Sequence, residues 1–159
     1  MVKIKNIKNN LKFSVRKMSI DDYDEVYRLW QGISHFAIRQ IDDSRLGIKK
    51  FLNRNKTTCV VAISDKKIVG SILCGHDGRE ACFYHVCVKE NMRNRGIATA
   101  MVDNIIKKLK KLNINKIRLV TFKDNKLGNS FWKDIGFDIN KSLNIYEKVL
   151  NLDNKIKIV

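Results

Sequence analysis

The polar loop that follows Val88 is the part of the sequence where residue types and spacing point most directly to chemistry. It joins an apolar, β-branched run to Gly96-Ile97-Ala98, the start of an amphipathic stretch. A strand, a loop and a helix N-terminus in this order can bind an anion, because the first N–H groups of the helix have no intrahelical acceptors and the helix dipole favours negative charge there. Gly96 allows the backbone to approach such a ligand closely, and Ala98 is too small to block it. The loop therefore predicts a diphosphate site, with a plain turn before a helix as the alternative.

Three apolar or β-branched runs precede this loop and are expected to hold it in position. They cover residues 57–64, 68–75 and 81–88, and turn-like segments separate them at 65–67 and 76–79. Short connections of this kind join neighbouring antiparallel strands. The centre of the chain is therefore expected to be a three-stranded antiparallel meander.

Further elements on either side complete an alternating pattern. The other expected strands are 12–17, 116–122 and 143–149, and the expected helices lie between Ser19 and Gly32, over 44–54, over 96–112 and over 126–135. Ser19 is expected to cap the first of these helices, and Gly136 to end the last in the left-handed conformation. The inward side chains of the helix over 44–54 are expected to be Leu46, Ile48, Phe51 and Leu52. The order of elements requires right-handed crossovers and one parallel strand pair. It predicts an α/β fold, a three-layer sandwich in which a mixed sheet of six to seven strands carries helices on both faces.

The composition of the 159-residue chain, 44% hydrophobic and 30% charged, predicts one soluble domain over 1–159 with its core in about 12–149. No apolar run approaches the ~20 residues that span a bilayer, so no membrane association is expected. The four cysteines show no Cys-x-x-Cys pair and no histidine spacing suited to zinc, so neither a metal site nor a disulfide framework is expected. The basic start of the chain lacks the apolar core of a secretory signal, which makes the cytoplasm the expected location.

The charge of the chain is strongly positive but unevenly distributed. Lysine and arginine outnumber aspartate and glutamate by 32 to 16, which gives a net charge of +16. Such a charge suits a nucleic acid, a membrane surface or a polyanionic small ligand, and a lysine-rich and asparagine-rich composition explains it equally well. Residues 107–118 are basic but have no interleaved aromatic residues for base stacking, so no specific nucleic-acid partner is expected. Residues 18–44, in contrast, are net negative.

Two motifs together resemble those of the GNAT superfamily of N-acetyltransferases. Arg93-Asn94-Arg95-Gly96-Ile97-Ala98 is similar to the Arg/Gln-x-x-Gly-x-Gly/Ala loop that binds acetyl-CoA in that family. Asn125-x-x-Gly128-x-x-Phe131-Trp132-x-x-x-Gly136-Phe137 is similar to the second signature, Asn-x-x-Ala-x-x-Phe-Tyr-x-x-x-Gly-Phe. The resemblance covers roughly residues 12–149. It implies the GNAT-like sandwich, acetyl-CoA as cosubstrate, and transfer of an acetyl group to a primary amine by direct attack in a ternary complex.

By this resemblance, acetyl-CoA enters a gap between the strand that ends at Val88 and the strand over 116–122. The pantetheine arm is expected to pair with the backbone of Val86 and Val88 as an added strand would. The diphosphate is expected to rest on the amides from Arg93 to Thr99. The residues assigned to the cofactor are Val86, Val88, Arg93, Asn94, Arg95, Gly96, Ile97, Ala98, Thr99, Asn125, Phe131 and Trp132. Helix capping is the alternative role for Asn125.

The expected catalytic residues are Tyr84 and Val88. The resemblance implies that a backbone N–H at the end of the central strand, from Val86 or Val88, stabilises the oxyanion. It also implies a tyrosine as general acid where this chain has Trp132, whose indole cannot usefully donate a proton. If side chains alternate along 81–88, Tyr84 shares a face with Val86 and Val88, and His85 points the other way. Core packing for Tyr84, an interior hydrogen-bonded role for His85, and a water chain with no dedicated base stay open.

The acceptor is expected to be a small-molecule or protein amine, and a cationic one. In this family the first two helices and their connection usually form the wall on the acceptor side, and here that segment is net negative. Its candidate acids are Asp24, Glu25, Asp42 and Asp43. Two other functions stay open: a CoA-binding sensor or partner module with little turnover, suggested by Trp132, and a basic nucleic-acid-binding protein. A homodimer is also left open.

Overall fold

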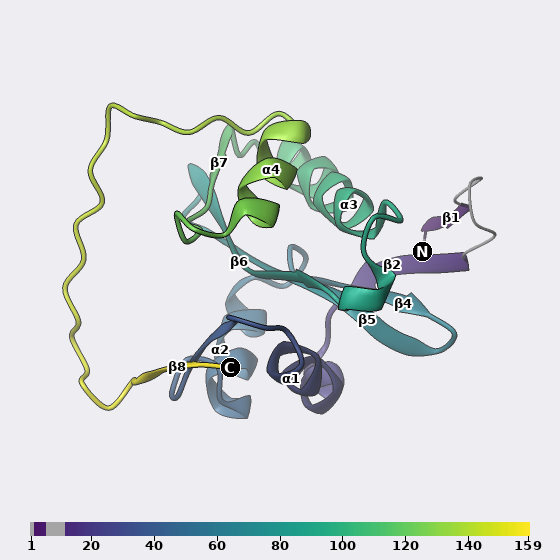
Figure 1. The fold of residues 1–159 in the computed structure, drawn as a ribbon, viewed down its shortest axis with the longest axis horizontal. Coiled ribbons are helices and arrows are strands. Elements are labelled where there is room, and N and C mark those ends of the chain that lie inside the picture. Colours follow the sequence, from purple (N-terminus) through teal and green to yellow (C-terminus); the bar gives the residue numbers. More distant parts are fainter. Residues whose placement is uncertain (1, 6–11) are drawn as a thin grey trace.

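The computed structural model describes the backbone of residues 2–5 and the whole of residues 12–159. Its main sheet has six strands in the order β1-β2-β4-β5-β6-β7 (Figure 1). The strands are β1 (Val2–Lys5), β2 (Lys12–Lys17), β4 (Val60–Ser64), β5 (Lys67–His76), β6 (Glu80–Val88) and β7 (Lys116–Arg118). All neighbouring strands are antiparallel except β6 and β7, which are parallel. The predicted mixed sheet is therefore confirmed.

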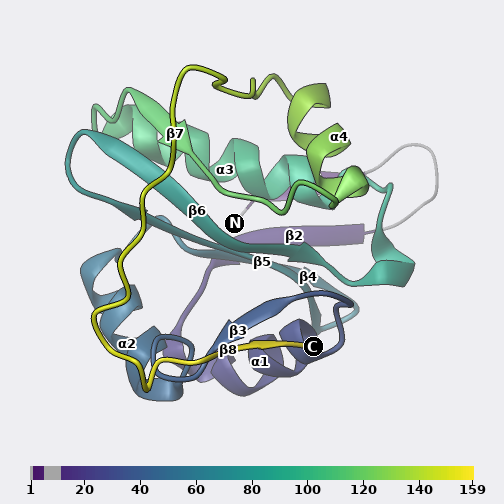
Figure 2. The same ribbon diagram turned by 60° about the vertical axis from the view of Figure 1, so that its left-hand side comes forward.

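Helices cover both faces of this sheet (Figures 1 and 2). One face carries α1 (Tyr23–Gln31) and α2 (Arg45–Arg54), and the other carries α3 (Ile97–Lys111) and α4 (Lys126–Asp134). Two short 3-10 turns, η1 (Ile20–Asp22) and η2 (Glu90–Met92), precede α1 and α3. The three-layer sandwich is as predicted, and α2, α3 and α4 start and end within one or two residues of their predicted bounds. The helix predicted after Ser19 instead begins as η1, and α1 starts only at Tyr23.

Each face of the sheet has its own hydrophobic core. On one side, Met101, Ile105 and Leu109 of α3 are buried against the sheet, as their spacing predicts. Burying a side chain of this size contributes roughly 2 kcal/mol. On the other side, Trp30 of α1 is fully buried and its Nε1 donates a hydrogen bond to Ser71 Oγ at 2.9 Å. The two cores hold the sheet rigidly between its helices.

The start of the first helical segment follows the predicted capping chemistry. The backbone N–H of Ser19 donates to Asp22 Oδ2 at 2.8 Å, the reciprocal bond of a capping box. Arg16 of β2 donates to both carboxylate oxygens of Asp22 at 2.7 Å. Burial acts to raise the pKa of Asp22, but the hydrogen bonds from Arg16 and Ser19 outweigh it and the pKa is lowered. These bonds join β2 to the start of α1.

The predicted inward face of α2 is correct except at Leu46. Ile48 is 1% exposed, whereas Leu46 is 79% exposed. A residue two positions before Ile48 lies about 200° away around an α-helix, so the two side chains cannot both face the sheet. The helix buries Ile48 and packs Phe51 and Leu52 against the same core.

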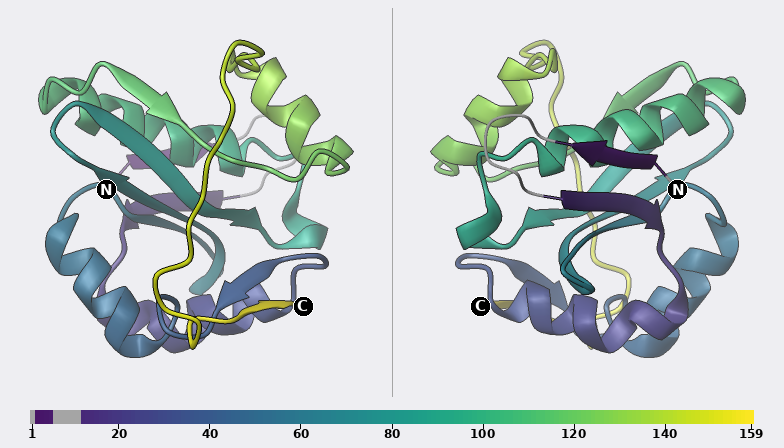
Figure 3. Two further views of the ribbon diagram at one scale, coloured as in Figure 1. Left: turned by 90° about the vertical axis from the view of Figure 1, so that its left-hand side faces the viewer. Right: turned by 90° about the vertical axis from the view of Figure 1, so that its right-hand side faces the viewer.

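Two strand predictions at the C-terminal side are wrong. The strand predicted over 116–122 is only β7, which ends at Arg118, and the strand predicted over 143–149 is absent. The chain instead runs over 138–155 as an exposed connection, which we call the C-terminal strap (Figure 3). After the strap, β8 (Ile156–Ile158) pairs with β3 (Ala37–Arg39) in a separate two-stranded sheet.

The C-terminal strap is anchored at its far end to the connection between α1 and α2. Asn154 accepts hydrogen bonds from the backbone N–H groups of Ile41 and Asp42 at 2.9 and 3.1 Å, and it donates to the Asp42 carboxylate at 2.7 Å. These contacts and the β3–β8 pairing draw the strap away from the edge of β7, so its alternating apolar residues have no strand to join. No helix in the described part of the chain is both long and apolar enough to cross a membrane.

Candidate active site

A β-bulge in the central strand β6 organises the site. Ser71 and Leu73 of β5 pair with Cys87 and Tyr84 of β6, so a single residue of β5 faces two residues of β6. His85 lies in the bulge with a φ of 50°. This left-handed conformation is uncommon for a residue other than glycine. A bulge bends its strand and interrupts the alternation of side chains.

The bulge corrects the predicted faces of β6. Phe83 packs in the same core as Val86 and Val88, on the side of α3 and α4. Tyr84 instead contacts Phe51 of α2, and His85 contacts the α1 side. The prediction that Tyr84 shares a face with Val86 and Val88 was wrong because it assumed an unbroken period of two. Tyr84 and His85, two consecutive residues, therefore both lie on the face covered by α1 and α2.

The pairing of β6 with β7 covers only three residue pairs, and we call the unpaired stretch between the two strands the gap. Their parallel pairing ends at Cys82 and Arg118, and the two strands then diverge (Figure 1). The N–H of Lys89 donates to Val69 O on β5 at 2.8 Å. Because neighbouring residues of a strand direct their polar backbone groups to opposite sides, the N–H of Val88 is directed toward the gap, while the Val88 carbonyl accepts Arg93 Nε at 3.2 Å. This edge of β6 can accept an extended ligand as an additional strand.

The loop between β6 and α3 presents converging backbone donors next to this gap. Asn94 has a φ of 58° and Gly96 a φ of 76°. Left-handed residues in such a loop turn successive N–H groups to one side, which forms a concave anion site. The first intrahelical bond of α3 runs from Ala100 N to Gly96 O at 3.0 Å, so the N–H groups of the first turn have no intrahelical acceptor. The residues predicted for the diphosphate, Arg93 to Thr99, thus lie together in one loop and helix start.

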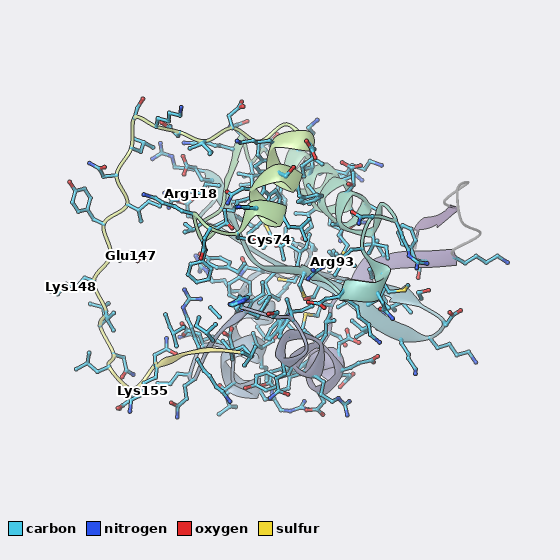
Figure 4. The ribbon with its side chains drawn as sticks, in the orientation of Figure 1. Cys74, Arg93, Arg118, Glu147, Lys148 and Lys155 are labelled. Atoms are coloured by element: carbon cyan, nitrogen blue, oxygen red, sulfur yellow. The ribbon has the colours of Figure 1, made fainter. Side chains whose placement is uncertain are left out.

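The side chains of Arg93 and Arg95 stabilise the loop. Arg93 Nε donates to Val88 O at 3.2 Å, and Arg95 Nη2 donates to Asn91 O at 3.2 Å. Figure 4 shows Arg93 where β6, η2 and α3 meet. Both guanidinium groups therefore fix the loop conformation and add positive charge where a diphosphate would lie.

Asn125 caps α4, which was the alternative considered for it. Its Oδ1 accepts a hydrogen bond from Gly128 N at 2.9 Å, as an N-cap side chain does. A Cβ added at Gly128 would lie 2.6 Å from Asn125 Nδ2. Glycine, which stands where the family motif has alanine, leaves room for this cap.

Trp132 belongs to the core rather than to the gap. It is 9% exposed and packs against Phe83 at 6.0 Å and Phe137 at 5.1 Å between ring centroids. Phe131 lies next to it at 4.9 Å and is only partly buried. Of the two aromatic residues assigned to the cofactor, Phe131 is therefore the better placed to contact it.

Tyr84 borders a pocket of about 240 Å³ on the face covered by α2. Its ring meets Phe51 edge to face at 5.8 Å, and it is 41% exposed. Burial raises the pKa of Tyr84 to about 12, and the Cys82 side chain beside it adds to the rise. The phenol therefore stays protonated at neutral pH, where it can donate a hydrogen bond but cannot act as a base.

A buried pair, His85 and Asp43, connects the bulge to the connection between α1 and α2. His85 Nε2 lies 2.6 Å from Asp43 Oδ1, and the two side chains are 8% and 5% exposed. The imidazole packs against Trp30 at 4.5 Å and Phe36 at 5.0 Å. The second oxygen of Asp43 accepts the N–H of Arg39 at 2.6 Å. The interior role considered for His85 is thus observed, but its partner, 42 residues away in sequence, carries no local signal that could have identified it.

The four acids predicted to attract a cationic acceptor all have partners within the protein. Asp43 is buried beside His85, and Asp42 accepts the Asn154 amide at 2.7 Å. Asp24 pairs with Arg45 at 2.6 Å, and Glu25 accepts the N–H of Ile68 at 2.8 Å. Each of these acids therefore has a role within the fold, but only Asp24 pairs with an arginine, and the bonds that Asp42 and Glu25 accept come from neutral amide groups.

Three of the four cysteines are buried and unsuited to nucleophilic attack. Burial raises the pKa of Cys59 and Cys87 to about 11 and that of Cys74 to about 12. A thiol that stays protonated is a poor nucleophile. Cys82 differs from them, because it is only partly buried and lines the pocket beside Tyr84.

Comparison with protein families explains this arrangement. The model described as "Acetyltransferase (GNAT) family" matches residues 21–137. The chain belongs to this family. GNAT acetyltransferases take their acetyl group from acetyl-CoA. The bulged β6, the gap beside β7 and the donor-rich loop before α3 are therefore parts of an acetyltransferase.

Relatives of this GNAT protein support the assignment. It is 30% identical over 141 residues to a protein named as an acetyltransferase from Sodalis glossinidius (strain morsitans), a match that covers 89% of this chain and 98% of the relative. It is 32% identical over 111 residues to another, from Pectobacterium atrosepticum, covering 70% of this chain and 77% of the relative.

Solved structures share the fold of this GNAT protein. Ard1 from Thermoplasma volcanium superposes with a TM-score of 0.70 at 23% identity, covering 80% of this chain and 84% of that one. The PaiA N-acetyltransferase from Thermoplasma acidophilum, in complex with coenzyme A, gives a TM-score of 0.72 at 18% identity, covering 80% and 91%. At these identities the likeness establishes the fold, while the roles of individual residues rest on the geometry described above.

Proposed function

We propose that this protein transfers the acetyl group of acetyl-CoA to a primary amine by direct attack in a ternary complex. The observation that carries the proposal is the position of the β6 bulge between the edge of β6 that β7 leaves unpaired and the pocket beside Tyr84. The gap and the loop over Arg93 to Thr99 lie on one side of it, and the pocket beside Tyr84 lies on the other. Two substrates could thus reach the same stretch of β6 from opposite sides.

The cofactor half of the proposal uses mainly backbone groups. The N–H groups from Arg93 to Thr99 would hold the diphosphate, and the edge of β6 at Val86 and Val88 would pair with the amides of the pantetheine arm. Phe131 would pack along that arm. We assign Asn125 and Trp132 supporting roles, because Asn125 caps α4 and Trp132 packs that helix against the core.

The reaction forms a C–N bond and breaks the C–S bond of the thioester. An alkyl amine with a pKa near 10.4 is about 99.9% protonated at pH 7, so it must lose one proton before attack and another afterwards. The backbone N–H of Val88, or that of Val86, would stabilise the oxyanion that develops on the carbonyl. The thiolate of CoA, with a pKa near 8.5, can leave without an immediate proton donor.

We assign Tyr84 as a hydrogen-bond donor that orients the acceptor, instead of as a base. Its raised pKa keeps the phenol protonated throughout the neutral range. The protons released by the amine would then pass to water through the pocket, which opens to solvent where Asp77 and Arg54 line it. This corresponds to the water chain considered from the sequence.

The acceptor in this proposal carries an ammonium group in solution, in line with the expectation of a cationic amine. The acids that motivated that expectation are bound within the protein, however. The selectivity for the remainder of the acceptor must therefore come from the pocket itself.

Turnover with a panel of amines tests the proposal. The purified protein is mixed with acetyl-CoA and polyamines, amino acids, aminoglycosides or peptides, and the released CoA thiol and the mass of the product are measured. We expect intersecting double-reciprocal plots, as for a ternary complex. Tight CoA binding without turnover on any amine would instead establish a binding module. Parallel plots that are lost in Cys82→Ser would establish an acetyl-cysteine intermediate.

A further inference from the structure

The pocket beside Tyr84 has the size of a small acceptor. Its volume of about 240 Å³ is below the range of roughly 300–1,000 Å³ typical of sites for drug-sized ligands. Residues from α2, β5, β6 and β7 line it, including Phe51, Gly75, Cys82 and Tyr84. A Cβ added at Gly75 would lie 3.1 Å from the Phe51 ring, so glycine at this position gives Phe51 the room to form one wall.

The two acids that line the pocket are already bound. The Asp77 carboxylate accepts two backbone N–H groups of its own turn at 2.8 Å, and these hydrogen bonds lower its pKa. Glu80 accepts Lys116 Nζ at 3.0 Å and lies 3.8 Å from Arg118 Nε. Glu80 is therefore paired with cations of the protein, whereas Asp77 uses one carboxylate oxygen, Oδ1, to hold its own turn.

Two arginine side chains that line the pocket have N–H donors that the described part of the protein leaves unused. Arg54, at the end of α2, lines the pocket, and its side chain makes no hydrogen bond or ion pair within residues 12–159. Arg118, the last residue of β7, has a side chain that is 72% exposed (Figure 4). Within residues 12–159 its one ion pair is the contact of 3.8 Å with Glu80, and its charge also opposes the rise that burial causes in the pKa of Tyr84. A planar guanidinium with unused donors matches a carboxylate, which it can bind through two parallel hydrogen bonds.

We infer that the acceptor is a small primary amine that also carries a carboxylate. Arg54 and Arg118 would bind the carboxylate, and the amine would then lie toward Tyr84 and Cys82, where β6 and β7 separate. The apolar wall formed by Phe51 would contact the carbon chain between the two groups. This inference deepens the proposed function and rests on it, because it names the acceptor class of the same transfer.

Matched pairs of amines test the inference. Glycine, β-alanine and 4-aminobutanoate are each compared with the amine that lacks the carboxylate: methylamine, ethylamine and propylamine. Measured by thiol release, kcat/KM for at least one acid is expected to exceed that of its partner by about tenfold or more, since an ion pair in a partly closed pocket gives effects of this size. In the double variant Arg54→Gln, Arg118→Gln the preference should fall below about threefold. Lys50→Gln, an exposed charge removal on the same helix, should keep it.

A binding experiment separates the two levels of the proposal. Saturation-transfer NMR of the same three acids with the CoA-loaded protein reports the carboxylate site without requiring turnover. Binding that is lost in the double arginine variant supports the site even if no amine is acetylated, in which case the transfer reaction is wrong. If the carboxylate-free amines react as well as the acids, or if Arg54→Gln, Arg118→Gln leaves the preference intact, the inference is overturned.

Discussion

The two halves of the active site differ in how far apart in sequence their parts lie. The cofactor half is nearly continuous, since the strand end at Val88, the left-handed residues Asn94 and Gly96 and the first turn of α3 follow one another directly. The acceptor half gathers residues from α2, β5, β6 and β7, and the buried contact of His85, which follows Tyr84 in the sequence, with Asp43 joins positions 42 apart. Local backbone geometry builds the first half, and tertiary packing builds the second.

This difference predicts how each half responds to mutation. A change in the cofactor loop should affect CoA binding and leave the rest of the fold in place. A change in the acceptor half should affect stability and acceptor use together, because the same contacts hold the fold and shape the pocket.

The largest effect is expected for Gly96→Glu. The new carboxylate would face the diphosphate. The backbone at this position has a φ of 76°, which is strained for any residue that carries a side chain. We expect CoA binding to weaken by roughly 100-fold or more, measured by isothermal titration calorimetry, since charge repulsion and strain act together. Gly136→Glu is the matched control, because Gly136 also has a left-handed φ, of 90°, with no atom within 4 Å of an added Cβ. Equal CoA affinity in the two variants would contradict the loop assignment.

Asp43→Ala should have the next largest effect, on stability and on the acceptor. It leaves the buried His85 and the N–H of Arg39 without their acceptor, which costs about 3 kcal/mol. Urea unfolding measures this loss, and kinetics should show a raised KM for the amine with the affinity for CoA unchanged. Asp24→Ala, which breaks the exposed pair with Arg45, should cost below about 1 kcal/mol. If the two variants have the same free energy of unfolding, the buried pair of His85 and Asp43 does not stabilise the acceptor half.

Much of the fold could be predicted because hydrophobic periodicity is a local signal. The α3 stripe and the three central strands were correctly placed, and so were the cap at Ser19 and the left-handed stop at Gly136. The C-terminal strand over 143–149 failed for a non-local reason. Its alternating apolar residues are typical of a strand, but whether a partner edge lies beside it depends on the direction of β7 and on the anchor at Asn154.

The same distinction applies to the site. The loop from Arg93 to Thr99 was found from the sequence, because its glycine and the helix that follows are adjacent. The faces of β6 were not predicted correctly, because a single extra residue at His85 moves each later side chain of the strand to the opposite face. The neighbouring sequence does not mark this bulge, because a positive φ is uncommon for any residue other than glycine and a single histidine in an apolar run does not predict one.

Tyr84→Phe should have a smaller effect and sharpens the assignment of the acceptor half. Loss of one hydrogen bond should lower kcat/KM by about tenfold without altering the shape of its pH profile below pH 10. If Tyr84 were the base, the wild-type profile would rise toward its pKa and the variant would lose that rise. The folded pKa of about 12 lies above the unfolded value, so any stability gained from the neutral phenol is present below pH 10 and is lost as the pH rises toward 12. Absorbance at the tyrosinate band, compared between wild type and variant, measures this titration.

The smallest effect on catalysis is expected for Trp132→Tyr, which restores the family's tyrosine on the cofactor side. If the cofactor half is built by backbone groups, the side chain here contributes packing alone, and kcat should change by less than about threefold. The smaller ring leaves space between Phe83 and Phe137 and places a hydroxyl in the core, so the free energy of unfolding should fall by about 1–3 kcal/mol. Trp132→Phe is the control, because it has a similar loss of volume without the hydroxyl. A kcat that rises about tenfold in Trp132→Tyr but not in Trp132→Phe would mean that a phenol here protonates the leaving thiolate, and the cofactor half would then depend on a side chain after all.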